Sequence, residues 1–258
     1  PISYGHPTVE STVSSEMTKI LFDISFNFFS YPHESVRNSA VYLFSTVVCT
    51  QMEKLEEYNL ISTLLGFITE ITSVEAAAAA LQCLATIISI DGSLKSVKEA
   101  ILPIVFKLLQ EHSDNVDIVS NSINLLRSCM SVIGSCFETD EAFIEFLRHL
   151  ISILENKEVK SSVYSFFIET FKTYPLHGVA IFDELFQYIV SDLTDSKDEQ
   201  ILLSASFLLQ GICSNKRIIE ESGSPIVSQM VEATLPIILL IMESFDYEEV
   251  LDYQEWKP

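Results

Sequence analysis

The chain repeats one kind of helix-forming segment at a nearly constant interval. Each repeat carries an aliphatic residue near its start, and these residues are Val36, Val74, Val116, Val159 and Ile201. Successive members of this set are 38, 42, 43 and 42 residues apart. Unrelated helices do not keep such a spacing over five units, so the chain is predicted to consist of repeated helical units.

The segment 74–90, VEAAAAALQCLATIISI, shows why these repeats are expected to be helical. It contains no Gly or Pro, and its five consecutive alanines have the highest helix propensity of any residue. The small alanine side chains would also let a neighbouring helix approach closely. Between Val13 and Phe29, apolar residues recur three and four positions apart, which is typical of an amphipathic helix. Tyr31-Pro32 would end that helix, because the residue before proline avoids the helical region.

A second predicted helix precedes each repeated one, so the units are helical pairs. The pairs are 13–29 with 34–50, 57–70 with 74–90, 94–111 with 116–131, 140–155 with 159–173, and 179–193 with 199–213. A polar turn is expected at 194–197, and a last unit has a short helix at 217–221 and a long one at 226–244. Ser113, Asp114 and Asn115 are N-cap candidates for the helix that follows them.

The composition agrees with an all-α fold. The sequence has only 7 Gly and 8 Pro, too few turn formers for a β-sandwich or a doubly wound sheet. Hydrophobic residues make up 48 % of the chain. The longest apolar runs, such as 236–242, are far shorter than the roughly 18–20 residues that span a membrane, so no membrane insertion is expected.

The formal net charge of −21 restricts the class of partner. Nucleic acids bind to basic surfaces that replace their counterions, so direct nucleic-acid binding is not expected. An anionic membrane surface would repel the chain for the same reason. A basic partner would be attracted. The same charge would also keep an apolar repeat protein in solution, and both interpretations stand.

The cysteines favour a reducing compartment. The five residues are irregularly spaced, form no CxxC pair and lie in apolar segments: Cys49, Cys83, Cys129, Cys136 and Cys213. They are predicted to be reduced core residues of an intracellular protein, cytoplasmic, nuclear or both. The chain begins Pro1-Ile2, without methionine, and we expect it to be part of a longer protein.

Nothing in the sequence indicates catalysis. The five histidines are scattered, and no HExxH, GxGxxG, GxxxxGK[ST] or GxSxG motif occurs. Adjacent acids such as Glu56-Glu57 diverge on a helix. The sequence therefore predicts no catalytic residues, no cofactor and no metal site.

Several segments resemble armadillo and HEAT repeats. The segment 35–44, SVRNSAVYLF, is similar to the second helix of a HEAT repeat, and 77–87, AAAALQCLATI, to the third helix of an armadillo repeat. The segment 214–231 resembles an armadillo junction, and 101–109 and 235–243 resemble first helices of HEAT units. The resemblance implies an all-α, right-handed α-solenoid of five to six repeats, forming one domain over 1–258 with an acidic-aromatic segment at 243–258.

The same resemblance implies a scaffold or adaptor that binds a protein or peptide partner in a larger assembly. An importin-β-type nuclear transport receptor fragment that binds basic cargo is the alternative. Importin-α-type binding is not favoured, because Trp256 is the only tryptophan and no regular asparagine ladder occurs. In HEAT repeats the position of Arg37 commonly pairs with an acid of an adjacent unit.

The groove of such a solenoid is lined by the second helix of each pair. The predicted partner-binding residues there are Asn38, Tyr42, Gln82, Asn121, Asn124, Tyr164 and Gln210. In the C-terminal segment, Phe245, Tyr247, Tyr253 and Trp256 stand among acids and either contact a partner or help cap the stack. Three phenylalanines near the N-terminal end are expected either to fill core or to form an open end that contacts flanking sequence or another subunit. They are Phe26, Phe28 and Phe29.

Overall fold

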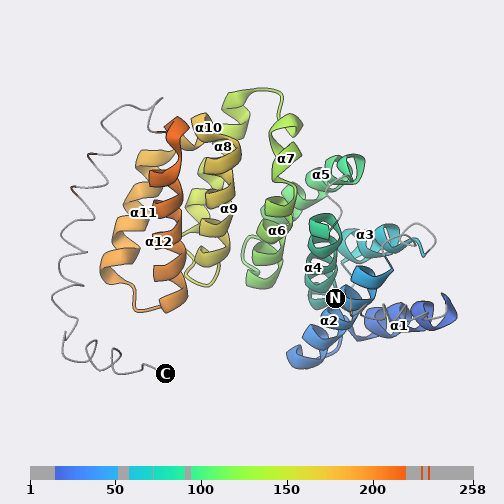
Figure 1. Ribbon diagram of the computed structural model, residues 1–258. Coiled ribbons are helices and arrows are strands. Elements are labelled where there is room, and N and C mark those ends of the chain that lie inside the picture. The colour runs from blue at the N-terminus through green and yellow to red at the C-terminus, as the bar shows by residue number, and fades with distance from the viewer. Residues whose placement is uncertain are drawn as a thin grey trace, which may run out of the picture. The chain divides into compact units, whose positions relative to one another are not determined.

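The computed structural model describes residues 15–51, 58–71, 73–90, 94–218, 228 and 232, and these residues form helices and turns without a strand (Figure 1). The all-α prediction is confirmed for this part of the chain. The chain divides into two compact units, Pro1–Ser128 and Cys129–Pro258. The single domain over 1–258 stays a prediction.

In its described residues, the first unit consists of three helical pairs. Its helices are α1 (Ser15–Phe28), α2 (Glu34–Thr50), α3 (Leu60–Glu70), α4 (Val74–Ile90), α5 (Lys95–Glu111) and α6 (Val116–Ser128). The two helices of each pair pack together, and α4 also packs against both α2 and α6. The second helices therefore form a continuous row, α2–α4–α6, within this unit.

An aromatic cluster fills the core between the first two pairs. The Phe44 ring lies 5.3 Å from Phe22 and 5.8 Å from Phe26, and the Phe29 ring lies 5.8 Å from Phe67. Phe22, Phe29 and Phe44 are almost fully buried. Phe26 and Phe29 thus fill core, as one of the two interpretations of the sequence proposed.

The second unit contains two helical pairs and shorter helices between and before them. Its elements are α7 (Met130–Ile133), the 3₁₀ helix η2 (Gly134–Cys136), α8 (Asp140–Ile153), α9 (Lys160–Thr173), α10 (Pro175–Ala180), α11 (Phe182–Asp195) and α12 (Glu199–Ser214). The pairs are α8 with α9 and α11 with α12. The second helices α9 and α12 pack against each other, and α10 fills the corner between α8, α9 and α11.

Two glycines allow the short helices to approach α9 and the residue that ends it. A Cβ on Gly178 in α10 would lie 2.5 Å from the Phe171 ring, and one on Gly134 would lie 2.8 Å from the Tyr174 ring. The Tyr174 hydroxyl accepts a hydrogen bond from the Gly134 N–H and donates one to the Met130 carbonyl. Tyr174 therefore anchors α7 and η2.

Most predicted helices are confirmed, and most differences lie at their ends. The helix predicted at 179–193 is wrong at its start, because Val179 and Ala180 belong to the separate helix α10 and α11 begins at Phe182. The predicted bounds of 34–50 and 74–90 agree with α2 and α4. The predicted helix 116–131 is wrong after Ser128, where α6 ends and α7 begins as a separate turn. The turn predicted at 194–197 is too long, because α11 continues to Asp195. The helix predicted at 226–244 and the segment 243–258 lie outside the described residues, apart from positions 228 and 232.

The cysteine prediction is correct in part. All five cysteines are free, and Cys83 and Cys129 are buried. Cys49 and Cys213 are exposed, so the prediction that every cysteine is a core residue is wrong. Both stand near the end of a helix, where the apolar pattern of the sequence no longer specifies burial. Within the described part of the chain, every helix is too short or too polar to cross a lipid bilayer.

Candidate functional site

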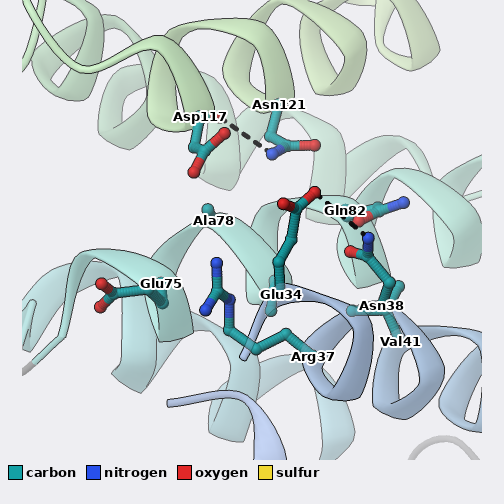
Figure 2. Close-up of a pocket in the computed structure, with 10 residues that line it drawn as sticks. Glu34, Arg37, Asn38, Val41, Glu75, Ala78, Gln82, Asp117 and Asn121 are labelled. Atoms are coloured by element: carbon teal, nitrogen blue, oxygen red, sulfur yellow. Dashed lines mark hydrogen bonds between the residues drawn. The ribbon is translucent and has the colours of Figure 1, made fainter. Parts of the chain in front are cut away.

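A small pocket of about 70 Å³ opens on the row of second helices in the first unit (Figure 2). Its floor is apolar and consists of Val41, Ala78 and Ala79. Its polar lining is Glu34, Arg37, Asn38, Glu75, Gln82, Asp117 and Asn121. Each of α2, α4 and α6 contributes one carboxylate from its first turn and one carboxamide from further along the helix.

The alanines of α4 make this convergence possible. The residues from Ala76 to Ala80 are all buried, and α4 packs against helices on both sides. Because an alanine side chain ends at Cβ, the neighbouring helices can approach closely without closing the space above Ala78 and Ala79. A larger side chain at either position would fill the pocket.

Local hydrogen bonds fix the N-terminal end of α4. The Ser73 hydroxyl accepts a hydrogen bond from the Ala76 N–H at 3.2 Å and donates one to Oε2 of Glu75 at 2.7 Å. The Ser73 hydroxyl and, as the smallest contribution, the Arg37 guanidinium lower the pKa of Glu75 below its usual value. Glu75 is therefore ionised at neutral pH.

The corresponding end of α6 is capped by Asn115, as the sequence predicts. The Asn115 side chain accepts a hydrogen bond from the Ile118 N–H at 3.0 Å. One turn further, the Asn121 amide donates to the Asp117 carbonyl at 2.9 Å, which leaves its side-chain oxygen available to a ligand. At the far end of the row, the hydroxyls of Ser89 and Ser128 lie 3.0 Å apart and link α4 to α6.

Among the described residues, Arg37 has no acidic group within ion-pair distance, although its charge contributes to the lowered pKa of Glu75 in the adjacent pair. Its guanidinium donates to the carbonyls of Tyr31 and Pro32, at 2.9 and 3.0 Å, and so holds the turn between α1 and α2. The pocket thus contains three carboxylates and one guanidinium that is already hydrogen-bonded to the backbone. Its formal charge is −2, in agreement with the acidity of the whole chain.

Three of the predicted partner-binding residues, Asn38, Gln82 and Asn121, meet at this pocket. Tyr42 is highly exposed on α2 and Asn124 is half-buried on α6, and neither lines the pocket. Gln210 is exposed on α12 of the second unit. The four aromatic residues predicted in the C-terminal segment, Phe245, Tyr247, Tyr253 and Trp256, lie outside the described residues.

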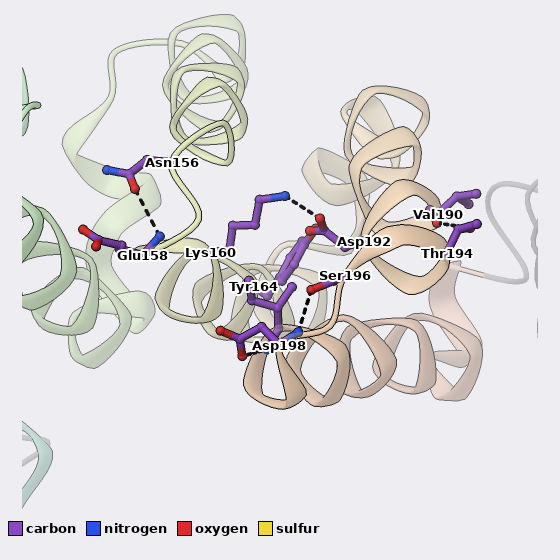
Figure 3. A network of polar contacts seen from close by, with 10 residues as sticks. Asn156, Glu158, Lys160, Tyr164, Val190, Asp192, Thr194, Ser196 and Asp198 are labelled. Atoms are coloured by element: carbon purple, nitrogen blue, oxygen red, sulfur yellow. Dashed lines mark hydrogen bonds and ion pairs between the residues drawn. The ribbon is translucent and has the colours of Figure 1, made fainter. Parts of the chain in front are cut away.

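The prediction that Tyr164 is exposed in a groove is wrong. Tyr164 is fully buried, and its hydroxyl donates to Oδ2 of Asp192, whose Oδ1 pairs with Lys160 (Figure 3). Burial and the adjacent carboxylate raise the pKa of Tyr164 well above its usual value. The residue joins α9 to α11 inside the second unit and cannot contact a partner.

The carboxylates Glu34, Glu75 and Asp117 are the site residues that sequence reasoning missed. Each stands in the first turn of a helix, where an acid also stabilises the helix dipole, so its place there has a structural explanation. The signal that could have revealed them is an acid in the first turn of three successive repeated helices, although Glu34 stands before the aliphatic residue of its repeat and Glu75 and Asp117 directly follow theirs.

No group of three His, Cys, Asp or Glu residues in the described ranges could hold a metal ion. Compared with known proteins, the chain matches no protein-family model and no curated protein sequence. The armadillo/HEAT resemblance therefore depends on the residues of the chain itself.

Proposed function

We propose that this chain is a non-catalytic protein-binding scaffold of armadillo/HEAT-type repeats, and that the face of α2, α4 and α6 holds a segment of a partner protein. The observation that carries the proposal is the pocket to which three successive repeated helices each bring a carboxylate and a carboxamide. The packing of consecutive pairs in each unit supports a stacked arrangement. In stacked repeats, neighbouring units present similar groups along one surface, which suits an extended ligand.

The carboxamides suit the backbone of such a ligand. A carboxamide offers both a donor and an acceptor, as a peptide group does. Asn38, Gln82 and Asn121 can therefore bind the main chain of an extended segment whatever its side chains are. The excess of carboxylates adds a preference for lysine or arginine in the segment, and this part of the attraction weakens as salt is added.

The test measures binding of two labelled peptides, one rich in lysine and one with glutamate in place of lysine. The triple variant Asn38→Ala, Gln82→Ala, Asn121→Ala removes the three amides, and Gln210→Ala is the control for an exposed amide elsewhere. At about 0.5–1.5 kcal/mol for each hydrogen bond, the triple variant should bind the lysine peptide roughly tenfold or more weakly. Gln210→Ala should bind it as the parent does.

Equal binding of both peptides, or equal binding by the triple variant and the parent, would refute this function for the pocket. The side chains removed are exposed or half-exposed, so circular dichroism should confirm an unchanged fold. Crosslinking in a cell extract, with the same two variants, then identifies the natural partner.

A further inference from the structure

Helix α1 has two apolar faces, and only one of them lies in the core. The inner face contains Phe22, which is 2 % exposed. On the outer face, Ile20 is 51 % exposed, and Ile24 and Phe28 are each 39 % exposed. A contiguous patch of large apolar side chains on a protein surface is often functional.

These side chains form one continuous stripe. At about 100° per residue, Ile20 and Phe28 project roughly 40° to either side of Ile24, so the three share one direction. Met17, 50 % exposed, falls in the same sector, and the Phe28 ring lies 5.6 Å from the ring of Tyr31, which is 40 % exposed. We call these five residues, Met17, Ile20, Ile24, Phe28 and Tyr31, the outer stripe.

The outer stripe is symmetric about its centre. Ile20 and Phe28 are each four residues from Ile24 on the helix, and Met17 is seven residues before it; Tyr31 is seven residues after it but lies beyond the end of α1, beside Phe28. A two-fold interface requires that residue i contacts residue j while residue j contacts residue i. Two copies of α1 that cross antiparallel at Ile24 satisfy this requirement, because Ile24 then meets its own counterpart and Ile20 meets Phe28 of the other copy.

We propose that the outer stripe is a homodimer interface, with a second copy of this chain as its occupant. The charge of α1 permits dimerisation, because the helix carries only Glu16, Lys19 and Asp23, a net charge of −1. The net charge of the whole chain, −21, opposes dimerisation. Added salt screens this repulsion between copies, so the dimer should strengthen with ionic strength, the opposite of the behaviour expected for the acidic pocket.

The area of the outer stripe sets the strength of the dimer. If each large side chain has about 200 Å² of surface, five that are 39–51 % exposed offer on the order of 400 Å² per copy. Two copies then bury about 800 Å² from these side chains, below the roughly 1,200–2,000 Å² of a stable complex. The dimer should therefore be weak and its population should depend on concentration.

The first test measures the molar mass of the whole chain by sedimentation over a range of concentrations. Ile24→Asp places a charge at the centre of the stripe, and Leu203→Asp, at a residue 49 % exposed on α12, is the matched control. The parent and Leu203→Asp should dimerise equally, and Ile24→Asp should dimerise at least tenfold more weakly. A parent that stays monomeric at every concentration and salt, or an Ile24→Asp variant that dimerises as the control does, overturns the proposal.

The second test determines the register by disulfide crosslinking, in a background where the exposed Cys49 and Cys213 are serine. Ile24→Cys should crosslink by itself. Ile20→Cys should crosslink much better when mixed with Phe28→Cys than alone. Equal crosslinking of Ile20→Cys alone overturns the symmetric register. If the thiol introduced at position 24 is protected from reagent in a monomer, another part of the chain covers the stripe, and the proposal is wrong.

Discussion

Replacing Asp192 by asparagine removes the negative charge from the buried cluster of the second unit. The side chains of Lys160 and Asp192 are only 10 % and 9 % exposed, and the Tyr164 hydroxyl donates to the same carboxylate. Loss of one partner from a buried ion pair costs about 3–5 kcal/mol, because the other charge remains without compensation. A pocket of about 510 Å³ borders Lys160, so its ammonium group can turn partly toward water. We therefore expect the lower end, about 3 kcal/mol.

Helix α9 supplies its own control for this prediction. Lys172 and Glu169 form an ion pair on its exposed side, with side chains 57 % and 39 % exposed, and Glu169→Gln should cost only about 0.2–0.5 kcal/mol. Urea unfolding followed by far-UV circular dichroism measures both changes. If Asp192→Asn lowers the free energy of unfolding no more than Glu169→Gln does, the argument from burial is refuted.

Three further outcomes are expected. Gly178→Ala should lower the free energy of unfolding by about 1–3 kcal/mol, because the new methyl group meets the Phe171 ring, whereas Gly66→Ala, with no atom near the new methyl, should raise it by about 0.5–1 kcal/mol. Thermal unfolding of the two variants checks this prediction. Changes of opposite sign in the free energy of unfolding agree with it, and changes of the same sign contradict it. The raised pKa of Tyr164 means that above pH of about 10 the unfolded state loses this proton while the native state keeps it. The free energy of unfolding of the parent should thus fall as the pH rises past that value, and it should fall less steeply in the variant Tyr164→Phe. An equal pH dependence of stability in the parent and the variant would contradict the raised pKa of Tyr164. Finally, a triple variant should be about as stable as the parent and more stable than Asp192→Asn, because an apolar cluster of similar volume then replaces the buried charges. Its substitutions are Lys160→Met, Asp192→Leu and Tyr164→Phe.

The sequence was most informative where structure is decided locally. Helix α2 follows the break that Pro32 predicts, and α4 contains the alanine run, which predicts a helix; both helices have the bounds expected from the sequence. The sequence did not reveal the end of α6 at Ser128 or the separate turns α7 and η2. Those turns are held by Tyr174, which lies about forty residues further along the chain.

The sequence also did not predict which amphipathic side chains are buried. Tyr164 and Tyr42 both occupy repeated helices and both looked like surface residues, yet Tyr42 is 76 % exposed while Tyr164 is fully buried. The difference arises from Asp192, on another helix, which accepts the hydrogen bond of the Tyr164 hydroxyl and so allows its burial. No pattern within α9 indicates that partner.

The sequence by itself determined most of the long helices and their spacing of about forty residues, because propensity, proline and apolar periodicity act over a few neighbouring residues. The tertiary structure alone decided which polar groups meet. Asn38, Gln82 and Asn121 line one pocket only because the small residues of α4 let α2 and α6 pack on either side of it. That convergence depends on packing between segments far apart in the chain.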